Sequence, residues 1–205
     1  MPEGSIHIIM KAGILLLLMG SWVAGSDRPV QRDYVLSEPY SVSIHGKFSI
    51  HNWSETVQKV SGELIGVVNE EGTADIKSIR MVMEVRSIKS DMGSVMDNKT
   101  YKALKADEDP EITFLLEVPF TIGRVMVGQK PVFLNGSLTL AGVTRPVIML
   151  IRSFKAANST LTIEGEQNIK MTDFGVKPPS ALFGTMKADP AITIEFNTVF
   201  TIQQK

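Results

Sequence analysis

Two histidines, His45 and His51, are the first candidates for chemistry in this chain of 205 residues. They lie in the stretch SIHGKFSIHNW, where Asn52 and Trp53 follow the second histidine directly. The chain has no cysteine, and its remaining histidine, His7, is close to the N-terminus. Metal binding or acid–base chemistry by an imidazole would therefore depend on this one stretch.

The spacing of His45 and His51 argues against a shared metal ion. In one continuous strand the two residues would lie about 20 Å apart, at about 3.3 Å per residue. If Gly46 and Lys47 formed a two-residue hairpin turn, the separation would still be about 10 Å. Both ligands of a zinc ion lie within about 2.1 Å of it. No HxH or HExxH motif accompanies the pair, so no metal site is predicted.

Patterns for other kinds of catalysis are equally weak. The sequence has no cysteine nucleophile, no GxSxG elbow and no glycine-rich phosphate loop. Asp173, in MTDFGVKPP, precedes a glycine at a strand end, where a turn-forming role is favoured over a general acid. His51 and Asp173 are therefore candidate polar contacts. No catalytic residue is predicted, and we do not expect an enzyme.

Composition and the N-terminus indicate one exported domain. Lys and Arg number 21 against 22 Asp and Glu, so there is no basic footprint for nucleic acid. Residues 1–25 contain the apolar run AGILLLLMGSWVAG, which is shorter than the roughly 20 residues of a membrane span. We predict a cleaved signal peptide over 1–25, a linker over 26–39 and one domain over 40–205. The protein is expected to be periplasmic or secreted, with no stable membrane span after cleavage.

Apolar residues that alternate at period two predict about eight strands, separated by turn-forming clusters of Gly, Pro, Asn and Asp. The segment Ser90–Pro110 departs from this pattern, because Val95, Tyr101 and Leu104 have helical spacing and predict one short helix. The stretches 112–118, 147–151 and 192–196 carry apolar side chains on both faces. This fits either a barrel with an apolar lumen or a homodimer.

Three motifs in this order resemble the YceI-like family of exported lipocalin-like proteins. They are DPEITF (109–114), GSLTLAGVTRPV (136–147) and IKMTDFGVKPP (169–179), and the resemblance covers about residues 40–202. The stretch SIHGKFSIHNW and the late loop are similar to a Bacteroidetes-type branch of the family. The resemblance implies an all-β fold, an extended eight-stranded antiparallel lipocalin-like β-barrel with one short helix.

The resemblance also implies a function, since some family members bind a polyisoprenoid or an isoprenoid quinone in the lumen. The quinone-type pattern has an Arg shortly before its Asp-Phe-Gly, and this chain has Met171 there. That change leaves open whether a quinone-type head group is bound.

We therefore expect an exported protein that holds a long apolar ligand, an isoprenoid, isoprenoid quinone or other lipid, without catalysis and without a cofactor. One alternative is an envelope-stress or structural barrel with no bound ligand. Another is a lipocalin-like enzyme that acts on a small apolar substrate through His51 and Asp173. The candidate lining residues are Phe48, Trp53, Phe114, Leu116, Leu138, Leu140, Phe174 and Phe196.

Overall fold

The computed structural model describes residues 30–49, 51–69, 72–126, 128, 130–157, 159–181 and 186–203. The predicted signal peptide, residues 1–25, lies outside these ranges. Among the helices within them, none combines the length and the hydropathy that crossing a bilayer requires.

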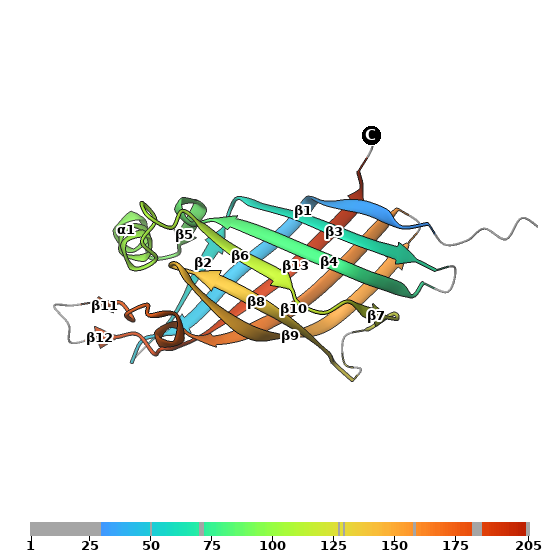
Figure 1. The fold of residues 1–205 in the computed structure, drawn as a ribbon. Coiled ribbons are helices and arrows are strands. Elements are labelled where there is room, and N and C mark those ends of the chain that lie inside the picture. Colours follow the sequence, from blue (N-terminus) through green and yellow to red (C-terminus); the bar gives the residue numbers. More distant parts are fainter. Residues whose placement is uncertain are drawn as a thin grey trace, which may run out of the picture.

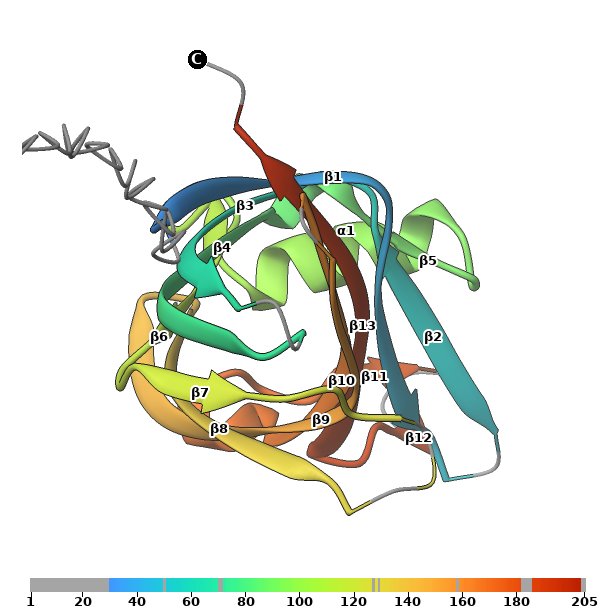
Figure 2. The same cartoon turned by 90° about the vertical axis from the view of Figure 1, so that its right-hand side faces the viewer.

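Eight antiparallel strands close into a barrel, as the sequence predicts (Figure 1). In the order given at the end of this paragraph, each strand pairs with the next, and the last strand pairs with the first, which closes the barrel. The end-on view shows the strands curving around a common axis (Figure 2). In order, the strands are β1 (Arg32–Lys47), β3 (Val60–Val68), β4 (Ala74–Glu84), β6 (Glu111–Leu116), β8 (Val132–Leu140), β9 (Val143–Ala157), β10 (Thr160–Lys170) and β13 (Ala191–Ile202).

Shorter elements complete the two ends of the barrel. At one end, β2 (Asn52–Val57) pairs with the later part of β1, and β5 (Ile88–Ser90) pairs with β2. The helix α1 (Ser94–Ala103) lies at this same end and confirms the predicted short helix (Figure 1). The remaining elements are η1 (Val85–Ser87), β7 (Phe120–Ile122), η2 (Met171–Phe174), β11 (Ser180–Ala181) and β12 (Met186–Lys187).

Strand β10 shows why this sequence forms a barrel wall. Leu161, Ile163, Gly165, Gln167 and Ile169 are buried, and the residues that alternate with them are half-buried or exposed. This alternation follows from the two-residue period of a strand, which turns every second side chain toward the same face. Burying each large aliphatic side chain stabilises the fold by about 1.5–3 kcal/mol. The lumen side of the strand is therefore specified by the sequence pattern itself.

The start of the domain differs from the sequence-based expectation in two ways. First, β1 begins at Arg32, so much of the segment 26–39, expected as a linker, is strand, and Tyr34 within it is buried. Second, of the two geometries considered for this stretch, the structure has a hairpin, but its turn does not lie at Gly46 and Lys47. Strand β1 continues through both residues, and the turn follows, where the Phe48 N–H donates to the His51 carbonyl over 2.8 Å. Gly46 is paired with Trp53 across the hairpin, which leaves it no freedom to form the turn.

Candidate ligand-binding lumen

Two adjoining cavities lie inside the barrel. The helix-side cavity is lined by residues of α1, including Met96 and Thr100, and by strand residues that include Trp53. The central cavity is lined by residues that include Phe114 and Phe200. Both cavities share four lining residues, so they are neighbouring parts of one lumen. The shared residues are Val42, Met83, Leu138 and Ile194.

The lumen is apolar and largely filled by its own side chains. Each cavity has a volume of about 80 Å³. For scale, a cavity of about 150 Å³ in another protein stays dry and binds benzene. A short apolar group fits each cavity, and a longer chain fits only if lining side chains move.

Methionine side chains supply a means for such movement. Met83 borders both cavities, Met96 and Met171 border the helix-side cavity, and Met81 and Met149 border the central one. An unbranched thioether side chain has several rotatable bonds and adapts its shape at low cost. The lumen can therefore widen through rotamer changes that leave the barrel strands in place.

Most of the predicted lining residues border the lumen. Phe48, Trp53 and Leu140 line the helix-side cavity, and Phe114 and Phe196 line the central cavity. Leu138 lines both. These side chains come from five separate segments of the chain, and the barrel brings them to one interior.

Two predicted lining residues lie elsewhere. Leu116 is half-buried and packs against the core, but it lines neither cavity. Phe174 is buried at the end of η2 and borders an open groove on the outside, together with the exposed Asp173. Leu116 is the last residue of β6, and Phe174 lies in η2, outside the alternation of the strands.

The structure does not bring His51 and Asp173 into the lumen. The exposed His51 ring contacts Phe48, with ring centroids 5.1 Å apart. Asp173 accepts a hydrogen bond of 3.0 Å from Arg145 Nε through its backbone carbonyl. His45 points outward, and its Nε2 lies 3.6 Å from a Glu195 oxygen. Over the described residues, no group of three or more His, Cys, Asp or Glu side chains is placed to hold a metal ion.

Three lumen aromatic residues lie against glycines of neighbouring strands. A Cβ atom added to any of these glycines would overlap the aromatic ring. The missing side chain lets each ring lie close to the barrel wall and leaves space toward the axis. The pairs are Trp53 with Gly46, Phe114 with Gly136 and Phe196 with Gly165.

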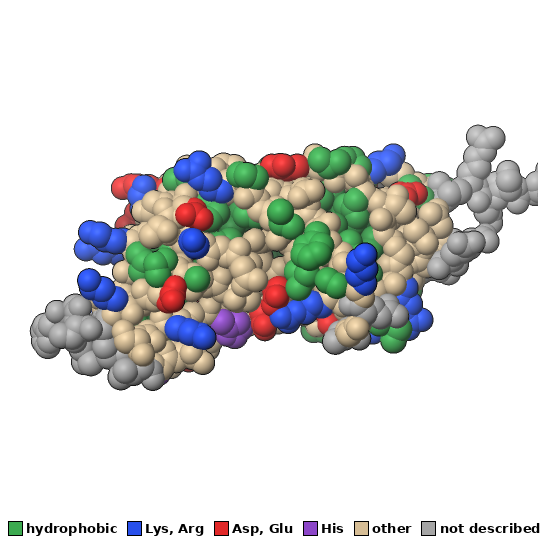
Figure 3. Space-filling view, turned by 90° about the horizontal axis from the view of Figure 1, so that it is seen from below, with side chains coloured by type: hydrophobic (Ala, Val, Ile, Leu, Met, Phe, Trp, Pro, Cys, Tyr) green, Lys and Arg blue, Asp and Glu red, His purple; other side chains and the backbone are tan. Residues whose placement is uncertain are grey.

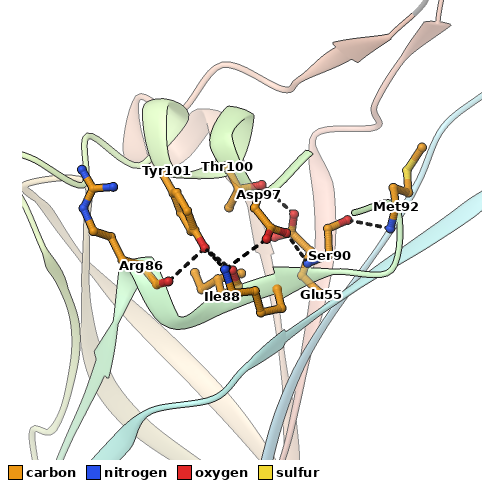
Figure 4. A network of polar contacts seen from close by, with 9 residues as sticks. Glu55, Arg86, Ile88, Ser90, Met92, Asp97, Thr100 and Tyr101 are labelled. Carbon is orange, nitrogen blue, oxygen red and sulfur yellow. Dashed lines mark hydrogen bonds and ion pairs between the residues drawn. The ribbon is translucent and has the colours of Figure 1, made fainter. Parts of the chain in front are cut away.

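Among the described residues that line the two cavities, Glu55 is the one with an ionisable side chain. It is 4% exposed, and one carboxyl oxygen accepts a hydrogen bond of 2.6 Å from Thr100 Oγ1 of α1 (Figure 4). Burial raises the pKa of Glu55 above its ordinary value, the Thr100 hydrogen bond opposes this, and the nearby Asp97 and Asp91 raise it further. The lumen wall therefore favours the neutral form of this carboxyl group.

A polar network beside Glu55 fixes α1 at the end of the barrel (Figure 4). Asp97 accepts hydrogen bonds from the Ser90 backbone N–H at 2.7 Å and from Lys89 Nζ at 3.1 Å. Tyr101 Oη donates to the carbonyl oxygens of Arg86 and Ile88, at 2.9 Å and 2.8 Å. The Ser90 N–H, followed by the Lys89 ammonium, holds the pKa of Asp97 below its ordinary value. The helix is thus tied to η1 and β5 by charge-assisted hydrogen bonds.

Two further buried polar atoms lie in lumen-lining residues and have no hydrogen-bond partner within the described part of the chain. They are Trp53 Nε1, a donor, and Gln167 Oε1, an acceptor. The Gln167 amide uses its nitrogen to donate to the Asn168 carbonyl over 2.8 Å. Buried polar atoms without a partner are uncommon in folded proteins.

Sequence reasoning missed Glu55 and Gln167. A signal for Glu55 was present, because Trp53, Glu55 and Val57 alternate along β2 and share its buried face. Gln167 likewise alternates with buried residues of β10. Both positions were missed because a polar residue within an otherwise apolar strand face was not expected to face inward.

The outer face seen in Figure 3 mixes hydrophobic, acidic and basic side chains and shows no large area of one charge. On the outside of the barrel, Arg152 pairs with two acidic residues, Glu166 and Glu195. Leu115, Phe133 and Ile148 are exposed on β6, β8 and β9. These residues account for the apolar character that the sequence shows on both faces of the strands.

Together, the fold and lumen define a closed up-and-down β-barrel with an apolar interior, a class in which the interior of eight strands is either filled by side chains or holds one small ligand. The chain belongs to the YceI-like domain family, whose model matches residues 36–200. Comparison with curated protein sequences finds no match. The comparisons do not separate branches of the family, so the Bacteroidetes-type branch stays a prediction.

Solved structures share this fold at low sequence identity. BcnA from Burkholderia cenocepacia is 21% identical, with a TM-score of 0.58 over 78% of this chain and 95% of that one. A polyisoprenoid-binding domain from Saccharophagus degradans, implicated in plant cell wall breakdown, is 12% identical, with a TM-score of 0.56 over 85% and 100%. A YceI protein from Campylobacter jejuni is 18% identical, with a TM-score of 0.51 over 77% and 88%. At these identities the likeness concerns the fold.

Proposed function

We propose that this protein is an exported carrier that holds one long apolar chain, an isoprenoid or another lipid, in its barrel lumen without chemical change. The observation that carries the proposal is the pair of adjoining cavities with almost wholly apolar walls. The similarity in fold to a polyisoprenoid-binding domain supports it, and the apolar N-terminal run supports export.

Binding would draw on the burial of apolar area. Each Å² removed from water contributes about 25 cal/mol before the cost of ordering the ligand and the side chains. Because the two cavities are small, the ligand-free barrel would have to open by moving Met83 and the other lining methionines. The carrier would therefore bind flexible, slender chains in preference to bulky rings.

Trp53 provides a direct assay, since the chain has two tryptophans and Trp53 lines the helix-side cavity. The processed protein has lost Trp22 with the predicted signal peptide, so titration with bromohexadecane is expected to quench the fluorescence of Trp53 to saturation at one chain per protein. The bromine atom quenches an indole only at close range, so quenching reports entry into the lumen.

A matched pair of variants tests where the chain binds. Leu138→Phe adds bulk where the two cavities meet, and Leu115→Phe makes the same change on the outer face. The added ring displaces about two methylene groups, each worth about 0.8 kcal/mol of burial, so Leu138→Phe is expected to weaken binding about tenfold. Leu115→Phe is expected to leave binding unchanged. No saturable quenching, or equal binding by both variants, would contradict the proposal.

A further inference from the structure

Glu55 and Trp53 form a polar point in the wall of the helix-side cavity. They are two residues apart on β2, and both are buried, at 4% and 8% exposure. The Cα atoms of two residues at this spacing on one strand lie about 6.6 Å apart. One oxygen atom that makes hydrogen bonds of about 2.8 Å to two groups spans nearly that distance.

The two residues offer complementary hydrogen-bonding groups. Trp53 Nε1 is a donor that has no partner among the described residues. Glu55 already accepts from Thr100 Oγ1 at 2.6 Å, and its carboxyl group can accept or donate further bonds. A ligand atom that both accepts and donates would satisfy the indole and the carboxyl group together.

The charges around this point disfavour an anionic head group. Asp91 and Asp97 lie near enough to act electrostatically on Glu55. The ammonium group of Lys89 is paired with Asp97 and donates a hydrogen bond to Tyr101 Oη at 2.8 Å. Among the described residues that line the two cavities there is no Lys or Arg. A phosphate or carboxylate would therefore be buried beside acidic groups without a cation.

A cationic head group is also disfavoured. An ammonium ion would require Glu55 to ionise within the apolar wall. The resulting buried ion pair loses the hydration of both charges, and that loss offsets the attraction between them. An uncharged group avoids this cost.

We propose that Glu55, with Thr100 and Trp53, forms a head-group site for an uncharged hydrogen-bonding oxygen, such as a hydroxyl group, at the end of a chain in the lumen. This inference rests on the proposed function and adds the chemical class of the ligand's polar end. The hydroxyl group accepts a hydrogen bond from Trp53 Nε1 and donates a hydrogen bond to a Glu55 oxygen. The apolar chain extends from there past Leu138 into the central cavity.

The test compares chains of one length that differ only at their end. Hexadecane, cetyl alcohol, palmitate, cetyl phosphate and cetylamine each compete with bromohexadecane for the purified processed protein, with Trp53 fluorescence as the readout. Cetyl alcohol is expected to compete about fivefold more strongly than hexadecane, the effect of about one net hydrogen bond, and more strongly than each charged chain.

Variants of Glu55 test whether this residue causes the preference for cetyl alcohol over hexadecane. Glu55→Leu is expected to remove the advantage of cetyl alcohol over hexadecane. Glu55→Gln, which keeps the size and hydrogen-bonding ability, is expected to retain most of that advantage and to improve competition by cetyl phosphate. Glu63→Gln, a matched change at an exposed position of β3, is expected to alter neither. If Glu55→Leu does not fold, Glu55→Gln still tests the inference through the phosphate.

Distinct outcomes overturn the two proposals. If alcohol and hydrocarbon compete equally in the unchanged protein, the head-group site is wrong and the carrier function stands. If cetylamine competes most strongly, or if Gln167→Leu removes the preference and Glu55→Leu does not, the site is likewise wrong. If no chain binds, the carrier function fails and the head-group site fails with it.

Discussion

Replacing Leu138 by alanine tests whether the lumen contains real space. Leu138 is 4% exposed and borders both cavities. Truncation of a buried leucine to alanine usually costs about 2–5 kcal/mol, through lost transfer free energy and the cavity left behind. Part of the Leu138 side chain faces empty space, so it makes fewer dispersion contacts than a fully packed leucine. We expect Leu138→Ala to lower the free energy of unfolding by about 2–3 kcal/mol.

Leu134 is the matched control for this truncation. It lies on the same face of β8, has the same 4% exposure and lines neither cavity. Because neighbours surround it, Leu134→Ala is expected to cost about 4 kcal/mol or more. Urea unfolding, with the slope m checked for constancy, measures both values.

Ligand addition extends the same experiment. A chain that enters the enlarged lumen at about 100 times its dissociation constant would return about 2.7 kcal/mol to Leu138→Ala. The reasoning is refuted if Leu138→Ala costs as much as Leu134→Ala, because the lumen around Leu138 would then be packed like the rest of the core.

Three further predictions concern the helix end of the barrel. Glu55→Gln is expected to resist urea better than the unchanged protein at about pH 8, and the difference should vanish near pH 4. Because the pKa of Glu55 is raised from its ordinary value of 4.5, ionisation of this carboxyl group destabilises the folded state at pH values above 4.5. An equal difference at both pH values would contradict this. Asp97→Asn is expected to lower the free energy of unfolding by about 1 kcal/mol at neutral pH. Because the pKa of Asp97 is lowered, its stabilising contribution is present above pH 3.8, its ordinary pKa, and disappears as the pH falls further. A loss of stability that persists in acid would speak against the network. Gly46→Ala is expected to cost about 1–3 kcal/mol and to shift the Trp53 emission, because the new methyl group overlaps the indole; an unchanged spectrum would show that the ring lies elsewhere.

Most of the fold could be predicted from the strand pattern and the motifs in the sequence. Alternation predicted strands in the segments that form β4, β8 and β10, and the break over Ser90–Pro110 predicted α1. Apolar character on both faces of the later strands pointed to a barrel or a homodimer. It reflects an apolar lumen inside, and exposed residues such as Ile148 outside.

The beginning of the domain was harder to infer because its signals compete. Gly46 looks like a turn residue, yet it lies mid-strand so that the indole of Trp53 can pack against the backbone. The prolines and charges before residue 40 suggest a linker, yet Tyr34 is buried within β1. Such cases depend on contacts between strands distant in sequence, which a local pattern does not contain.

The lumen's polar residues show the same limit. The period of β2 places Glu55 inward, but only the approach of α1 supplies Thr100 as its partner. No spacing rule in the sequence joins these two residues. The site at the helix end is therefore a product of the tertiary fold, whereas the apolar wall can be inferred from the pattern.

The measurement that tests the carrier function most directly is mass spectrometry of an organic extract from the protein purified from its own host, with Leu138→Phe and Leu115→Phe prepared in parallel. We expect one long-chain, uncharged lipid per protein in the unchanged chain and in Leu115→Phe, and much less in Leu138→Phe. An extract without a stoichiometric chain, or one that Leu138→Phe leaves unaltered while the variant remains folded, would contradict the account.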